Sequence, residues 1–241
     1  MSKLAKRLRK LADYIDTPDY VTARRLGVPL RQYQFFQRVK EYNICCILDI
    51  GANSGEFARW CASTFGNVPI HCFEPLPQCE ASLRRVAERY RNIQLHLFAL
   101  GDQEGEFEMY ENDFAPSSSL LPMLDRHREL WPKTRLDHKI NIQVKTLDQV
   151  FSGQPFSGPV FMKMDVQGFE MHVLHGAESM LKNVAVIMLE VLFENLYEGQ
   201  SSLQDMMNYL SQRGFRFLEF MDERRLPPLG KLVYADAVFV R

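Results

Sequence analysis

Residues 46–58 read Cys46-Ile47-Leu48-Asp49-Ile50-Gly51-Ala52-Asn53-Ser54-Gly55-Glu56-Phe57-Ala58. An apolar run typical of a buried strand comes first, and a helical pattern follows a turn that lies between two glycines. Glycine lets the backbone approach a ligand where a Cβ would collide, and a helix N-terminus presents free N–H groups. The stretch predicts a strand, a ligand-binding turn and a helix, and so a site for a nucleotide-like cofactor.

The spacing of the glycines argues against two common phosphate sites. Gly51 and Gly55 have three residues between them, so the stretch has neither the Gly-x-Gly-x-x-Gly of a dinucleotide site nor the Lys-Ser/Thr of a P-loop. A second apolar strand, 68–73, is followed by Glu74, whose carboxylate is placed to accept hydrogen bonds from two ribose hydroxyls. The glycine spacing of the first turn, together with the acid after the second strand, favours a nucleoside without phosphates.

A third predicted strand, 93–100, ends in Gly101 and Asp102. We expect this strand end to close over an adenine with a backbone N–H and a carboxylate. Together the three strand ends predict an adenosine pocket.

Five motifs occur in order along the chain: Leu48-Asp49-Ile50-Gly51-Ala52-Asn53-Ser54-Gly55, Phe73-Glu74-Pro75, Ala99-Leu100-Gly101-Asp102, Ser117-Ser118-Ser119-Leu120 and Met162-Lys163-Met164-Asp165-Val166-Gln167-Gly168-Phe169-Glu170. Their order and spacing over roughly residues 44–195 resemble the FkbM-type S-adenosylmethionine-dependent methyltransferases. The resemblance implies the α/β class I methyltransferase fold: a Rossmann-like three-layer sandwich with a mostly parallel seven-stranded sheet and an antiparallel C-terminal strand.

The resemblance also implies the cofactor, S-adenosyl-L-methionine, and places Gly51 to Gly55 under its methionine part, Glu74 on the ribose and Asp102 near the adenine. The expected cofactor-binding residues are Asp49, Gly51, Ala52, Asn53, Gly55, Glu74, Pro75, Leu100, Gly101, Asp102, Ser118 and Asp165.

Length and composition narrow the class of protein. A chain of 241 residues suits one α/β domain with an extension. With 29 basic and 30 acidic residues, no global charge recruits nucleic acid or an anionic membrane. The five cysteines include no Cys-x-x-Cys pair, which is typical of buried free thiols, and no apolar run is long enough to span a bilayer. We expect a cytoplasmic protein without a transmembrane segment.

Two units are expected along the chain: a helical N-terminal extension, 1–43, and a methyltransferase domain, 44–241. The first 16 residues form a basic amphipathic pattern, interpreted either as a peripheral contact with a membrane surface or partner, or as a helix that caps its own domain or the mate in a homodimer. A second helix is predicted over 30–41, where Tyr33, Phe35 and Phe36 either roof the cofactor site or pack in the core.

The domain is expected to alternate strands and helices, as a parallel sheet requires. The predicted strands are 45–50, 69–73, 93–100, 160–165 and 185–190, and the predicted helices are 55–65, 78–90, 170–181 and 201–212. A terminal hairpin covers 215–220 and 233–240. The alternating segments 104–110 and 139–144 predict half-exposed antiparallel strands on either side of an insertion, 111–138, which we interpret as a lid over the acceptor site.

Acidic residues follow the strands of this predicted sheet. Asp49, Glu74, Asp102, Asp165 and Glu190 all fall at carboxyl ends, where open α/β sheets bind ligands. Such a rim suits a sulfonium cation with an amino group and repels a polyphosphate.

Asp165 and Glu190 are the candidate general bases, and Lys163 is placed to orient the acceptor. The alternative for Asp165 is a structural cap on the helix that starts at Glu170. A divalent metal on the two carboxylates is a further option, but no third ligand is evident and we predict no metal site. His172, three residues before His175 on one helix, is expected to pack or to face solvent.

These features predict an O-methyltransferase that acts on a small-molecule or glycan hydroxyl, in a sugar or a natural product. Methylation of amino groups in nucleic acid is disfavoured because Val166-Gln167-Gly168 stands where the Asn/Asp-Pro-Pro-Tyr/Phe clamp of those enzymes would be. A non-catalytic methyltransferase-like binding or adapter protein is the alternative.

Overall fold

The computed structural model describes residues 18–134 and 137–241. Its large sheet consists, from edge to edge, of β3 (Ile93–His96), β2 (Ile70–Phe73), β1 (Cys46–Ile50), β7 (Val160–Met164), β8 (Val184–Leu192), β10 (Lys231–Val240) and β9 (Arg216–Leu226). β10 runs antiparallel to both of its neighbours, and every other pair of adjacent strands is parallel. The predicted class I methyltransferase fold, with its antiparallel C-terminal strand, is confirmed.

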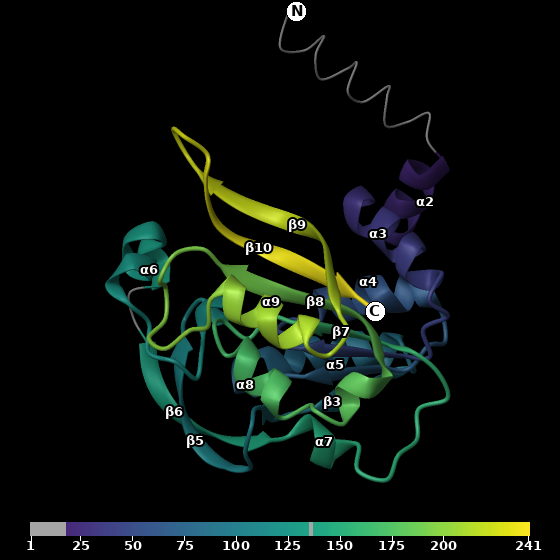
Figure 1. Ribbon diagram of the computed structural model, residues 1–241, viewed down its shortest axis with the longest axis horizontal. Coiled ribbons are helices and arrows are strands. Elements are labelled where there is room, and N and C mark those ends of the chain that lie inside the picture. Colours follow the sequence, from purple (N-terminus) through teal and green to yellow (C-terminus); the bar gives the residue numbers. More distant parts are fainter. Residues whose placement is uncertain (1–17, 135–136) are drawn as a thin grey trace, which may run out of the picture.

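Helices cover both faces of this sheet (Figure 1). The α-helices are α2 (Pro18–Leu26), α3 (Leu30–Lys40), α4 (Glu56–Phe65), α5 (Pro77–Arg89), α6 (Asp125–Leu130), α7 (Leu147–Val150), α8 (Glu170–His175) and α9 (Leu203–Ser211). The core on one face joins α3, α4 and α5 to the strands, and the core on the other joins α7, α8 and α9. Every residue of β1 is buried, as expected for a parallel strand covered on both sides.

The helix predicted over 30–41 packs in the core. Phe35 and Phe36 are buried against Phe57 and Phe161, and neither lines a cavity. The interpretation that these two rings roof the cofactor site is therefore wrong, whereas Gln32 of the same helix does line the larger cavity.

The strand predicted over 93–100 is divided. β3 ends at His96, Leu97 is 39% exposed, and β4 (Ala99–Leu100) joins a second sheet with β6 (Asp137–Lys145) and β5 (Gly105–Asn112). β4 bonds in parallel to Val144 and Lys145, which draws the chain away from the large sheet. The antiparallel pairing predicted for the segments flanking the insertion is confirmed as β5 and β6.

The helix predicted over 170–181 is shorter than expected, because α8 ends at His175. A Cβ at Gly176 would lie 1.9 Å from the carbonyl oxygen of Gly101, so the chain passes the β4 end too closely for any other residue. A 3₁₀ turn, η3 (Met180–Asn183), follows.

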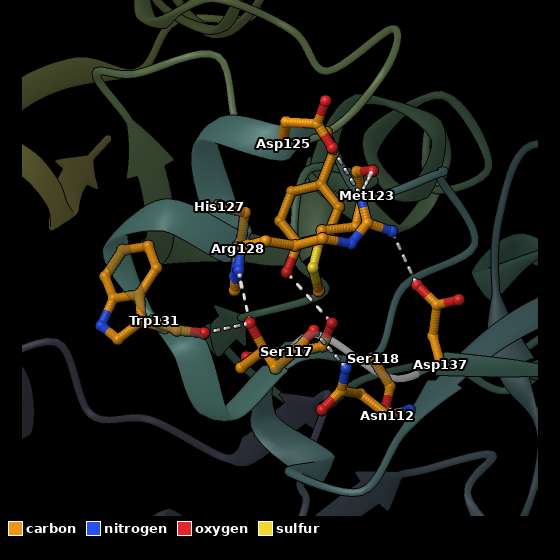
Figure 2. Close-up of polar contacts among 11 residues, drawn as sticks. Asn112, Ser117, Ser118, Met123, Asp125, His127, Arg128, Trp131 and Asp137 are labelled. Carbon is orange, nitrogen blue, oxygen red and sulfur yellow. Dashed lines mark hydrogen bonds and ion pairs between the residues drawn. The ribbon is translucent and has the colours of Figure 1, made fainter.

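The insertion between β5 and β6 contains η1 (Ala115–Ser117), α6 and η2 (Pro132–Thr134). Arg128 donates hydrogen bonds to the carbonyl of Met123 and to Asp137, and His127 Nδ1 lies 3.1 Å from Thr134 Oγ1 (Figure 2). These contacts connect the described residues of the insertion to one another and to the first residue of β6.

Within residues 18–134 and 137–241, no helix combines the length and apolarity needed to cross a membrane. The basic amphipathic helix predicted over the first 16 residues lies outside the described residues.

Candidate functional site

A cavity of about 340 Å³ opens at the carboxyl ends of β1, β2 and β7, and the insertion forms its opposite wall. Its volume falls within the range of small-molecule and cofactor sites. The predicted site residues that line it are Gly51, Ala52, Asn53, Glu74, Pro75, Leu100, Ser118, Lys163 and Asp165. The structure thus brings together residues from motifs spread over more than a hundred positions of sequence.

The two glycines of the β1 turn are required by the protein itself. A Cβ at Gly51 would lie 1.9 Å from the carbonyl oxygen of Asp165, and a Cβ at Gly55 would meet Leu83 and Val86 at 3.1 and 3.2 Å. Both glycines have positive φ, 74° and 82°. Packing and backbone conformation are therefore enough to require glycine at both positions; Gly51 lines the cavity, whereas Gly55 lies outside its lining.

Glu74 is buried at the end of β2, with 4% of its surface exposed. Its Oε2 accepts a 2.7 Å hydrogen bond from the backbone N–H of Asn53, and its Oε1 accepts a 3.0 Å bond from that of Leu76. Burial raises the pKa of this carboxyl, and the two backbone donors oppose the rise. The carboxylate is thus oriented from the protein side, and its remaining acceptor capacity suits two hydroxyl groups of a ligand.

Asp49 lies beneath the cavity rather than in its wall. It is completely buried, and its Oδ1 is 3.3 Å from Lys163 Nζ. Lys163 Nζ also donates a 3.0 Å hydrogen bond to the carbonyl of Gly51 and lies 3.9 Å from Asp165 Oδ2. Burial would lower the pKa of Lys163, but the carboxylates of Asp49 and Asp165, together with Asp236, outweigh burial and raise it. Lys163 is a fixed cation that ties the β1 turn to Asp165.

Gly101 and Asp102 also lie outside the lining. Asp102 pairs with His172 Nδ1 at 3.1 Å, and the ring of His172 stacks on Phe169 with centroids 4.1 Å apart. The chain therefore turns Asp102 toward α8, because the strand that was expected to carry it to the rim is broken before Ala99.

A second cavity, of about 290 Å³, contains the remaining predicted residue, Glu190. Asp165 and Gln167 line both cavities. The side-chain amide of Gln167 donates to Asp165 Oδ1 at 2.8 Å and to Glu190 Oε2 at 2.7 Å. One amide group therefore holds the two candidate bases side by side at the junction of the cavities.

Asp165 does not cap α8, contrary to the structural alternative. The N-terminus of α8 has no side-chain cap, and the carboxylate of Glu170 instead orders the loop before the helix, with Oε1 accepting hydrogen bonds from the backbone N–H groups of Val166 and Gly168. The side chain of Asp165 is 42% exposed and free to face both cavities.

The serine triplet is buried in the wall formed by the insertion. Ser118 Oγ accepts from the backbone N–H of Asn112, while Ser119 Oγ donates to the carbonyl of Gln167. The hydroxyl of Tyr197 donates to Gln167 Oε1 at 2.8 Å. Gln167, which bridges Asp165 and Glu190, is therefore also bonded to Ser119 of the insertion and to Tyr197.

The lining residues that were not predicted as site residues include Gln32, Trp60, Asp222 and Asp236. Asp236 lies opposite Glu190 on β10, and Asp222 lies where the pairing of β9 with β10 shifts register. Both belong to the terminal hairpin and lie within its strands rather than just after a strand end, so no strand-end rule points to them. Burial, with Asp165 and Asp222, raises the pKa of Asp236 to about 7.

The lining fits a nucleoside cofactor that carries positive charge. Glu74 suits ribose hydroxyls, and the side chains of Leu100, Phe73 and Phe169 form an apolar wall. Among the described lining residues, the acidic side chains of Asp165 and Asp236 outnumber the one basic side chain, Lys163. Among the described side chains, no group of three or more His, Cys, Asp and Glu is arranged to hold a metal ion.

The chain is similar to several known proteins. Residues 49–217 match the family described as the methyltransferase FkbM domain. The 2-O-methyltransferase NoeI of Sinorhizobium fredii is 29% identical over 175 residues, which are 68% of this chain and 70% of that protein. Methyltransferase 1 of Beauveria bassiana is 26% identical over 156 residues, or 58% of this chain and 63% of that protein. TehB from Haemophilus influenzae superposes with a TM-score of 0.49 at 11% identity, over 92% of this chain and 66% of that one.

Proposed function

The chain belongs to the FkbM methyltransferase family, and on this premise we propose that it is an S-adenosyl-L-methionine-dependent O-methyltransferase. Its proposed acceptor is a hydroxyl of a sugar, a glycan or a natural product. The observation that carries the proposal is that Asp165 lines both cavities, so one carboxylate faces the cofactor side and the acceptor side.

The larger cavity is the proposed cofactor site. Glu74 would accept hydrogen bonds from the ribose hydroxyls, Leu100 and Phe169 would contact the adenine, and the turn 51–53 would lie under the amino-acid end. When bound, the cofactor supplies a methyl group on a positively charged sulfur, which needs no assistance to leave. The residues of the chain therefore have to align the acceptor and remove its proton.

Asp165 is the proposed general base. A hydroxyl in the second cavity would donate its proton to Asp165 as its oxygen forms the bond to the methyl carbon. Lys163 Nζ lies 3.9 Å from Asp165 Oδ2 and so holds the two segments that carry the turn and the base together. Glu190 is less suited, because it is buried, and burial and the neighbouring carboxylates raise its pKa well above its ordinary value.

Two findings support oxygen as the acceptor atom. An alcohol needs a base beside it, and the site provides a carboxylate at the junction of the cavities. The relative from Sinorhizobium fredii is a 2-O-methyltransferase by name.

The test is formation of S-adenosylhomocysteine by the purified chain, with S-adenosyl-L-methionine and a panel of hydroxyl acceptors that includes neutral glycosides and polyketide alcohols. We expect turnover with at least one acceptor, and a methyl ether in the product by mass spectrometry. Methylation of nitrogen or sulfur alone, or tight cofactor binding without turnover on any acceptor, would contradict the proposal.

A further inference from the structure

The second cavity has an aromatic wall. Trp131 and Tyr234 both line it, with ring centroids 6.2 Å apart and planes inclined by 37°. Trp131 follows α6, and its carbonyl accepts a 2.7 Å hydrogen bond from the Thr134 hydroxyl (Figure 2). Its ring lies 4.7 Å from that of His127, centroid to centroid. The insertion therefore holds Trp131 in place beside a strand of the large sheet.

Acidic residues also line the same cavity. Asp165, Glu190, Asp222 and Asp236 line it, and no lysine or arginine does among residues 18–134 and 137–241. His127, the remaining basic side chain of the lining, has its pKa lowered to about 4 by burial and by Arg128, so it is neutral near pH 7. The cavity offers hydrogen-bond acceptors and no compensating positive charge.

The aromatic residues and the acidic residues of this cavity suit different parts of one kind of molecule. The face of an aromatic ring is electronegative and attracts the polarised C–H groups of a saturated ring. Carboxylates accept hydrogen bonds from hydroxyl groups, whereas a second anion would be repelled and would lose its hydration without gaining a partner. A volume of about 290 Å³ is near the lower limit for ligand sites and suits a single ring rather than a long chain.

We propose that the second cavity is the acceptor subsite and that it takes an uncharged sugar ring, which lies against Trp131 and Tyr234. The hydroxyl groups of this ring bond to Asp165, Glu190 and Asp236, and the site rejects sugars that carry a carboxylate or a phosphate. This inference rests on the proposed methyltransferase function and adds the class of acceptor and the residues that select it.

The two tryptophans of the chain allow the two cavities to be observed separately, because Trp60 lines the first and Trp131 the second. Trp131→Phe leaves Trp60 as the fluorescent reporter of cofactor binding. Trp60→Phe leaves Trp131 as the reporter of acceptor binding. The probes are S-adenosylhomocysteine and three matched pairs of methyl glycosides: glucoside and glucuronide, galactoside and galacturonide, mannoside and mannoside 6-phosphate.

With the Trp60→Phe protein saturated by S-adenosylhomocysteine, we expect at least one neutral glycoside to change Trp131 fluorescence, with a Kd at least tenfold lower than that of its anionic partner. Equal or tighter binding of the anionic partners, or no response to any neutral glycoside, would overturn the acceptor assignment. Lack of a Trp60 response to S-adenosylhomocysteine in Trp131→Phe would instead contradict the proposed function.

A kinetic comparison gives an independent measurement with the wild-type chain and its Trp131 variants. Trp131→Ala should raise KM for the best neutral glycoside at least tenfold while the Kd for S-adenosylhomocysteine changes less than threefold. Trp131→Phe should restore KM to within about threefold of the wild-type value. A KM that is unchanged in Trp131→Ala, or a loss confined to kcat, would show that Trp131 does not bind the acceptor.

Discussion

The position that a Cβ would take at Gly51 is 1.9 Å from the backbone carbonyl oxygen of Asp165. The turn after β1 and the loop after β7 are therefore in direct backbone contact. Since Lys163 Nζ donates to the carbonyl of Gly51 and lies near Asp165 Oδ2, the same two segments are also joined by a side chain. The cofactor turn and the proposed base cannot move independently.

Gly51→Ala should therefore destabilise the protein far more than an alanine at another glycine with positive φ. The new Cβ would meet the Asp165 carbonyl, and φ is 74°. We expect a loss of more than about 3 kcal/mol in the free energy of unfolding, measured by urea denaturation. Gly66→Ala is the matched control, because φ there is 67° and nothing lies within 4 Å, so it should cost only the backbone strain, about 1–3 kcal/mol. Equal losses at the two positions would refute the close-contact argument.

Glu74→Ala should weaken binding of S-adenosyl-L-methionine at least tenfold in titration calorimetry. It removes the acceptor proposed for two ribose hydroxyls, and hydrogen bonds to charged groups contribute about 1.5–3 kcal/mol each. Glu80→Ala, which removes an exposed carboxylate of α5 paired with Arg84, is the control and should bind normally. Unchanged affinity in Glu74→Ala would remove Glu74 from the cofactor site.

Asp165→Asn should retain cofactor binding and lose turnover. The amide keeps the size of the side chain but accepts no proton, so kcat should fall about 10²- to 10⁴-fold. Asp125→Asn, on the surface of the insertion with a 96% exposed side chain, should leave kcat unchanged. If Asp165→Asn turned over at the full rate while Glu190→Gln did not, the base would be Glu190.

Glu170 makes stability depend on pH. Its carboxyl is buried, and burial raises its pKa from 4.5 to about 7 against the backbone hydrogen bonds that it accepts. The folded state binds this proton more tightly than the unfolded state, so stability from this group is present below pH 4.5 and lost as pH rises to about 7. The slope is at most about 1.4 kcal/mol per pH unit.

Glu170→Gln should remove that loss, because the neutral amide can still accept at Oε1 from Val166 and Gly168. The free energy of unfolding should be measured by urea denaturation at pH 5 and pH 8. The difference between Glu170→Gln and the wild type should shift in favour of the variant at the higher pH. Glu106→Gln, an exposed site, is the control. Parallel stability curves for the wild type and Glu170→Gln would contradict the prediction.

Arg128→Ala should loosen the insertion. Arg128 joins the carbonyl of Met123 to Asp137 across this segment, so its loss should increase hydrogen exchange over residues 113–134 and raise the acceptor KM. Exchange in α9 should not change. Arg84→Ala, which breaks an exposed ion pair on α5, is the control. Unaltered exchange in the insertion would show that the Arg128 bonds do not order it.

Much of the site could be predicted from the sequence because its residues are local to strand ends. The apolar run before Gly51 identifies β1, and the acid after β2 identifies Glu74, since parallel strands end at one edge of a sheet. The break after His96 could not be predicted, because residues 93–100 contain no glycine or proline and read as one strand, and only the pairing of Ala99 and Leu100 with β6 divides it.

The order of strands and helices, the family and the residues of the β1 turn can all be inferred from the amino-acid sequence, because they depend on periodicity and on motifs a few residues long. Which acidic side chains meet depends on how the chain folds. Asp49 faces inward to Lys163 and Asp102 turns to His172, while Asp222 and Asp236 reach the cavities from an antiparallel hairpin, 32 and 46 residues after Glu190. Side-chain direction and strand pairing depend on contacts between distant residues, and no local pattern encodes them.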